Sequence, residues 1–241
     1  MNISEIVGDA VRYPFSDWKK ILIFGILIVF MELSPIFQSL GFKNVELTIL
    51  SLIALIIFLL FVGGYQYRII KSSLNDVAVP PEFNAWRDMF VDGIRVTMVV
   101  IGYLLPGIFI IGFIAGIFIA SGANQFTQIF IAIAILYIII FIPIYLMAIA
   151  YMADNGSKLG TAFRFHEILN KISLKGRVNF IIWYILTGII FLVILIIGSS
   201  LTNDIGRLTF PTIGIILLSL VVNPYLSMYI NRSVALFYIS K

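Results

Sequence analysis

The chain has 241 residues, of which 61% are hydrophobic and only 12% are charged, and its mean hydropathy is +1.09. A soluble domain carries roughly 25% charged residues, so this composition excludes a soluble globular protein and indicates an integral membrane protein. Cysteine is absent, which excludes disulfides and thiolate metal sites. The net charge of +4 is informative through the position of each charge, and we expect no nucleic-acid partner.

The first 20 residues predict a helix that lies on the membrane surface. Asn2 and Glu5 have the spacing of a capping box. Apolar residues then recur at helical spacing, with charged residues on the other side, as in interfacial helices. Trp18, Lys19 and Lys20 would anchor the start of the first membrane span. The alternative is a disordered, solvated tail.

Six stretches are long and apolar enough to cross a bilayer, which takes about 20 residues. Residues 96–153 contain no Asp, Glu, Lys or Arg, which fits two spans joined by a turn at 121–125. Each span must be helical, because lipid offers no partner to backbone N–H and C=O groups. The predicted spans are 21–40, 47–67, 96–120, 126–152, 178–201 and 210–230.

The Lys and Arg residues lie almost entirely in the two termini and in every second loop between these spans. Of the 16 Lys and Arg residues, all but Lys43 and Arg207 fall on one side. Because Lys and Arg are retained in the cytoplasm, we expect both termini and the loops 68–95 and 153–177 to be cytoplasmic, in the cell membrane. The predicted fold is all-α: a polytopic membrane protein with a bundle of six transmembrane helices, amphipathic interfacial helices on the cytoplasmic side, and one integral membrane domain over 1–241.

The first cytoplasmic loop contains the polar stretch PPEFNAWRDMFVDGIRV, residues 80–96. Its two prolines predict an extended segment, and Asn84 predicts the cap of a helix that starts at Ala85. One face of that helix would carry Trp86, Met89, Phe90, Gly93, Ile94 and Thr97, and the other Arg87, Asp88, Asp92 and Arg95.

This amphipathic helix is the candidate partner-docking surface. Asp92 and Arg95 are spaced to form an ion pair. Asp88 and Asp92 share a face that suits a bound cation or a basic partner, or else a solvated face neutralised by Arg87 and Arg95. The docking candidates are Trp86, Arg87, Asp88, Phe90, Asp92 and Arg95.

The second cytoplasmic loop predicts a similar helix. Its apolar face would carry Ala162, Phe163, His166, Leu169 and Ile172, opposite Arg164, Glu167, Asn170 and Lys171. His166 is the only histidine, and we interpret it as an interfacial side chain or, alternatively, a pH-sensitive contact.

Short similar sequences suggest an internal repeat of three helical hairpins. YLLPGI resembles YILTGI, and the even-numbered spans end in GGYQYR, PIYLMAIAY and NPYLSMYINR.

Two polar residues fall inside predicted spans and are candidate intramembrane sites. Glu32 lies near the middle of span one, where a charge costs about 2.5–3.5 kcal/mol, unless that span is tilted or broken at Pro35. Asn223 precedes Pro224, which frees a carbonyl one turn earlier and predicts a kink.

Other helix irregularities are predicted at Pro106 in span three and Pro143 in span four. Gly112 and Gly116 form a GxxxG motif that predicts close helix packing, within the monomer or between copies.

The strings GGYQYRIIK, PPEFNAWRDMFVDGIRV, GYLLPGI and AFRFHEILNKI resemble a family of prokaryotic, mainly archaeal, membrane proteins known only as domain of unknown function 4013. This resemblance implies a multi-pass membrane protein. It implies no substrate, cofactor or catalytic residue.

Three functions remain open. The first is a non-catalytic module whose interfacial helices dock on the membrane surface or a partner. That partner is a membrane or cytoplasmic protein or a second copy of the chain. The second is a small transporter or lipid-handling protein that uses its kinked helices and Glu32. An enzyme is disfavoured, because no catalytic, metal-binding or cofactor-binding motif occurs.

Overall fold

A computed structural model describes residues 1–122 and 126–240, and this part of the chain is helical with no strand. The all-α prediction is therefore confirmed. The elements are α1 Ile3–Arg12, η1 Tyr13–Ser16, α2 Trp18–Met31, α3 Leu33–Ser39, α4 Val45–Leu74, α5 Trp86–Ala120, α6 Thr127–Asp154, η3 Leu159–Phe163, α7 Phe165–Lys175, α8 Arg177–Leu208, α9 Pro211–Leu217, η4 Leu218–Val222 and α10 Asn223–Ile239.

The helices account for the predicted membrane spans. Five are long and apolar enough to cross a bilayer: α4, α5, α6, α8 and the run from α9 to α10. The pair α2 and α3 makes a sixth span if it is counted as one, with a bend of 69°. The bend falls at Glu32, between the two helices. The predicted turn at 121–125 lies partly outside the described residues.

Several spans extend further than predicted, among them α4, which continues to Leu74, and α8, which continues to Leu208. The amphipathic helix of the first loop is continuous with span three, since α5 runs unbroken from Trp86 to Ala120. The last helix continues to Ile239, nine residues beyond the predicted end at 230. Pro106 and Pro143 each lie inside a single continuous helix.

The N-terminal helix is ordered by its own cap and by protein packing. The backbone N–H of Glu5 donates to Asn2 Oδ1 at 2.8 Å, and the N–H of Asn2 donates to Glu5 Oε2 at 2.9 Å. The predicted capping box is confirmed, and a disordered tail is excluded. Ile6, Val7 and Ala10 are buried, and α1 packs along α10. The apolar face of α1 thus covers protein.

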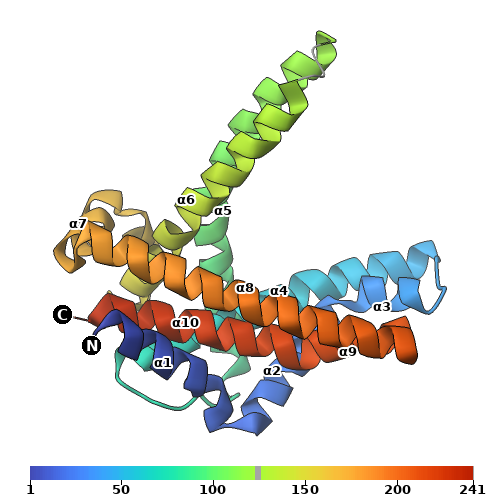
Figure 1. Ribbon diagram of the computed structural model, residues 1–241, viewed down its shortest axis with the longest axis horizontal. Helices are drawn as coiled ribbons and strands as arrows, with labels where there is room; N and C mark the ends of the chain where they lie inside the picture. The colour runs from blue at the N-terminus through green and yellow to red at the C-terminus, as the bar shows by residue number, and fades with distance from the viewer. Residues whose placement is uncertain (123–125, 241) are drawn as a thin grey trace.

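The chain folds as three helical hairpins that meet at one end (Figure 1). They consist of α2–α3 with α4, α5 with α6, and α8 with the run from α9 to α10. The α5–α6 hairpin projects away from the other two (Figure 1). The hairpin arrangement agrees with the predicted repeat, whose origin by duplication stays a prediction.

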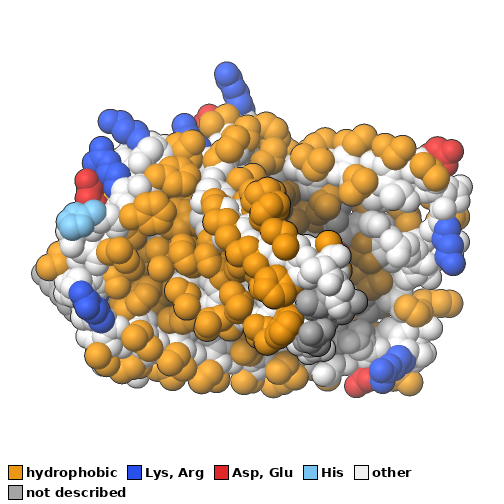
Figure 2. Space-filling view, turned by 90° about the horizontal axis from the view of Figure 1, so that it is seen from above, with side chains coloured by type: hydrophobic (Ala, Val, Ile, Leu, Met, Phe, Trp, Pro, Cys, Tyr) orange, Lys and Arg blue, Asp and Glu red, His pale blue; other side chains and the backbone are white. Residues whose placement is uncertain are grey.

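The buried core lies where the hairpins meet, in the later turns of α4, α6 and α10 together with α2 and the early turns of α5. We call this end, which also carries α1, α7 and the loops 75–85 and 155–164, the polar end. Away from it, apolar side chains cover the surface and charged groups lie at the margins (Figure 2). This distribution fits helices surrounded by lipid.

Glycines bring α4 and α5 into backbone contact. A Cβ on Gly64 would lie 1.7 Å from the carbonyl oxygen of Met89, and one on Gly93 would lie 1.8 Å from that of Leu60. By contrast, a Cβ on Gly112 or Gly116 would meet nothing within 4 Å. The predicted GxxxG packing is therefore not made within the described part of the monomer, and contact between copies stays a prediction.

We expect Gly93→Ala to destabilise the fold by about 1–3 kcal/mol, because the added methyl group must push two helices apart. Thermal unfolding in detergent would measure this effect, with Gly112→Ala as the matched control on the same helix. Equal unfolding temperatures for the two variants would contradict the proposed crossing.

Candidate functional site

A buried arginine joins four segments at the polar end. Arg232 of α10 is 2% exposed, and its Nε donates to Asp9 Oδ1 at 2.7 Å. Its Nη1 donates to the carbonyl of Val77 at 2.8 Å, and its guanidinium lies 5.0 Å from the ring centroid of Tyr13. Arg232 follows the predicted end of span six at 230, and no local sequence signal indicated this structural role. The pairing fixes α1 and the loop after α4 onto α10.

Tyr13 is itself buried beside this cation. Burial raises the pKa of the Tyr13 hydroxyl above its ordinary value, so the hydroxyl stays neutral. Three buried hydroxyls, those of Tyr13, Tyr67 and Ser73, have no hydrogen-bond partner among the described atoms.

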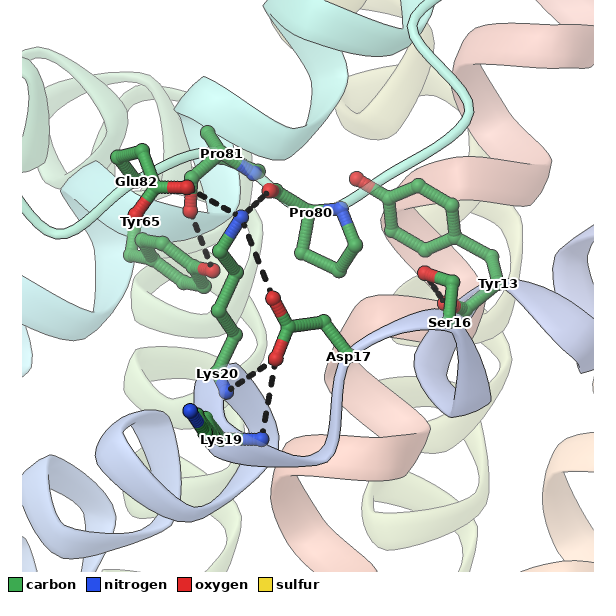
Figure 3. Close-up of polar contacts among 9 residues, drawn as sticks. All are labelled: Tyr13, Ser16, Asp17, Lys19, Lys20, Tyr65, Pro80, Pro81 and Glu82. Atoms are coloured by element: carbon green, nitrogen blue, oxygen red, sulfur yellow. Dashed lines mark hydrogen bonds and ion pairs between the residues drawn. The ribbon is translucent and has the colours of Figure 1, made fainter.

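A second buried cation, Lys20, binds the loop 75–85 and holds it against α2 (Figure 3). Lys20 Nζ lies 2.7 Å from Glu82 Oε1 and 3.5 Å from Asp17 Oδ2, and it donates to the carbonyl of Pro80 at 2.7 Å. The Tyr65 hydroxyl donates to the carbonyl of Pro81 at 3.0 Å. Lys20 was predicted to anchor the chain to the membrane surface, but its charge is paired inside the protein.

The start of α5 is set by a contact that the sequence did not reveal. Arg68 Nη1 donates to the carbonyl of Asn84, and Nη2 donates to that of Ala85 at 2.8 Å. Ala85 is left-handed, with φ of 46°, and α5 begins at Trp86 without a side-chain cap. The prediction that Asn84 caps a helix starting at Ala85 is therefore wrong.

The six docking candidates lie on different sides of α5 and differ in their burial and contacts. Trp86 and Phe90 pack against Phe61, with ring centroids 5.8 and 5.5 Å apart. Asp92 is largely buried and pairs with Arg95, as predicted.

The remaining two candidates stay open to solvent. Arg87 and Asp88 are exposed, and neither has an ion pair among the described residues. Trp86, 44% exposed, lies next to them. Any docking surface is therefore centred on Trp86, Arg87 and Asp88 alone.

The two intramembrane candidates lie in different places. Glu32 is half-buried at the bend between α2 and α3. Asn223 begins α10, and its N–H donates to the carbonyl of Leu218, five residues back. The irregularity predicted at Pro224 thus takes the form of a π-helical turn. No described contact joins Glu32 to Asn223.

A glycine on α2 lets that helix pack against the π-helical turn. Pro224 cannot donate to the carbonyl of Leu220, the residue one turn earlier. A Cβ on Gly25 would lie 2.2 Å from that carbonyl oxygen. Only glycine therefore lets α2 pack directly on the turn.

An apolar groove lies beside this turn, between α2, α8 and the start of α10. We call it the lateral groove. Its volume is 330 Å³, and Phe15 packs against both Trp18 and Tyr225 at its rim. The lining residues are Phe15, Trp18, Ile21, Ile194, Ile197, Gly198, Val221, Val222 and Tyr225.

The second loop buries only part of the apolar face predicted for it, since Ala162 and Ile172 are buried as predicted but Phe163 is exposed. Ile168 and Ile172 are the buried residues of α7, whereas His166 and Leu169 are exposed. A hydrogen bond from the Tyr151 hydroxyl lowers the pKa of the Glu167 carboxyl and fixes α7 against α6. Among the described residues, no cluster of three His, Asp or Glu could hold a metal ion.

The model of a family described as "Protein of unknown function (DUF4013)" matches residues 47–202. The chain belongs to this family. The match begins in α4 and ends in α8, so α10 and its buried Arg232 lie outside it. No curated protein and no solved structure matches the chain.

We expect Asp9→Asn to loosen α1. Breaking a fully buried ion pair costs about 3–5 kcal/mol, but Asp9 is 38% exposed, so we expect a loss of about 1–3 kcal/mol. Hydrogen exchange should rise across α1, while Asp88→Asn, which removes an unpaired acid, should leave it unchanged. Unaltered exchange in both variants would show that the Arg232 pair does not hold α1.

Proposed function

We propose that this chain is a non-catalytic membrane protein that binds a bilayer lipid in the lateral groove, with no cofactor or metal. The observation that carries the proposal is the groove itself. Its volume of 330 Å³ is within the range of about 300–1,000 Å³ for small-molecule sites. Its lining is apolar, apart from the polar atoms of Trp18 and Tyr225.

The groove opens where lipid would enter. Phe15, Trp18 and Ile197 are each more than half exposed. Indole and phenol rings favour the boundary between headgroups and acyl chains. The Tyr225 hydroxyl donates to the carbonyl of Val11 at 2.9 Å, which fixes the rim. The Gly198 backbone packs on Val222 at the base, where a Cβ would lie 2.7 Å from Val222 Cγ1.

We place the polar end and both termini in the cytoplasm, in the cell membrane. The support is the distribution of Lys and Arg in the sequence. In this orientation the exposed aromatic rings near the polar end would lie at the inner leaflet surface, consistent with an aromatic belt.

Docking of a protein partner is a second candidate function. It is favoured by the exposure of Trp86 beside the unpaired side chains of Arg87 and Asp88. Tryptophan and arginine are enriched in the residues that contribute most to protein interfaces.

Photo-crosslinking tests the lipid proposal. A phospholipid with a diazirine on one acyl chain, reconstituted with the protein, should label peptides that line the groove. We expect Ile197→Trp to reduce this labelling several-fold, because the larger ring fills the groove.

Ile189→Trp is the matched control, since Ile189 lies on the same helix and is similarly exposed, at 51% against 56% for Ile197. Labelling spread evenly along α8, or equally reduced by both substitutions, would contradict a lipid site in the groove.

A further inference from the structure

A small basic pocket lies between the last turns of α4 and the loop 75–85. Its volume is 260 Å³, and we call it the basic pocket. It is lined by Arg68, Lys71, Ser72, Asn75, Pro81, Glu82 and Asn84.

The pocket carries an excess of positive charge. Arg68 and Lys71 stand three residues apart and therefore share a face of α4. The one acid in the lining, Glu82, has its carboxylate 2.7 Å from Lys20 Nζ, a cation that also lies 3.5 Å from Asp17. With Arg68 and Lys71 added, the cations around the pocket still outnumber the acids.

Both cations keep donors free. Arg68 donates to the carbonyls of Asn84 and Ala85 and, at 3.5 Å, to Asn84 Oδ1, so at least two of the five N–H groups of its guanidinium remain. Lys71 is exposed, and its only described side-chain hydrogen bond is a long one, 3.5 Å, to Ser157.

The wall of the pocket is already fixed in place. Lys20 holds Pro80, Tyr65 holds Pro81 (Figure 3), and Arg68 holds Asn84. A ligand would not have to order this loop, which lowers the cost of binding.

We propose that the basic pocket binds a phosphate group, carried either by a phospholipid headgroup or by a soluble phosphate ester. Guanidinium and ammonium groups are the side chains that bind phosphate most strongly. Arg68 directly follows the predicted span 47–67, where lipid headgroups lie. This inference goes beyond the lipid groove and depends on other residues.

Two binding measurements test the proposal on the full chain in detergent. One follows thermal unfolding as inorganic phosphate replaces chloride at constant ionic strength. The other counts phosphatidylglycerol molecules retained in native mass spectrometry, with phosphatidylcholine as the reference lipid. We expect Lys71→Gln to weaken binding about tenfold, the effect of losing one charged hydrogen bond.

Arg87→Gln is the matched control, because it removes an exposed cation in the first turn of α5, just after the loop 75–85 and outside the pocket. Binding of phosphate alone would identify a soluble ligand, and binding of phosphatidylglycerol alone a lipid. Either result supports the site if Lys71→Gln reduces the stabilisation by phosphate, or the excess of phosphatidylglycerol over phosphatidylcholine, and Arg87→Gln leaves both unchanged. Ile197→Trp should lower the retention of both lipids alike, which separates a failure of the groove from a failure of the basic pocket. Binding of neither probe, or an equal effect of Lys71→Gln and Arg87→Gln, would overturn it.

Discussion

Apolar helices in a bilayer gain little by hiding from one another, because lipid tails are as apolar as leucine. Cohesion must come from backbone contact and hydrogen bonds. This chain concentrates both at the polar end, around α10, which contacts α1, α2, α4, α6 and α8. Trp183 Nε1 donates to Ser233 Oγ at 2.9 Å, and Gln66 Nε2 donates to Ser227 Oγ at 2.8 Å. The outer halves of the hairpins make fewer such contacts, among them a 2.8 Å hydrogen bond between the Ser39 and Thr212 hydroxyls and the close approach of Gly206 to Gly214, and they expose many apolar side chains.

The same constraint explains how a firm core and a lipid-accessible groove coexist. The helix opens into a π-helical turn just before Pro224, and the Gly25 backbone packs on the Leu220 carbonyl within that turn. That turn forms one side of the lateral groove. The irregularity predicted at Pro224 thus lies beside the groove in which we propose that lipid binds, while the turns of α10 nearer its C-terminus are buried.

Features set by neighbours in sequence were predictable: the helical spans, the capping box of α1 and the Asp92–Arg95 pair. Features set by distant partners were not. Lys20 and Arg232 look like surface cations until the fold brings Glu82 and Asp9 to them. Asn84 has the side chain of a helix cap, but Arg68 holds its backbone carbonyl. The buried face of α7 also depends on a partner, since periodicity alone fits more than one face.

The central claim is that the chain crosses the bilayer with its polar end on the cytoplasmic side. Because the chain has no cysteine, a thiol reagent can modify only the single cysteine that a substitution introduces. In intact cells, a membrane-impermeant maleimide should modify Lys43→Cys at once and Lys158→Cys only after permeabilisation. Modification of both positions from the same side would contradict the topology and the cytoplasmic placement of the polar end.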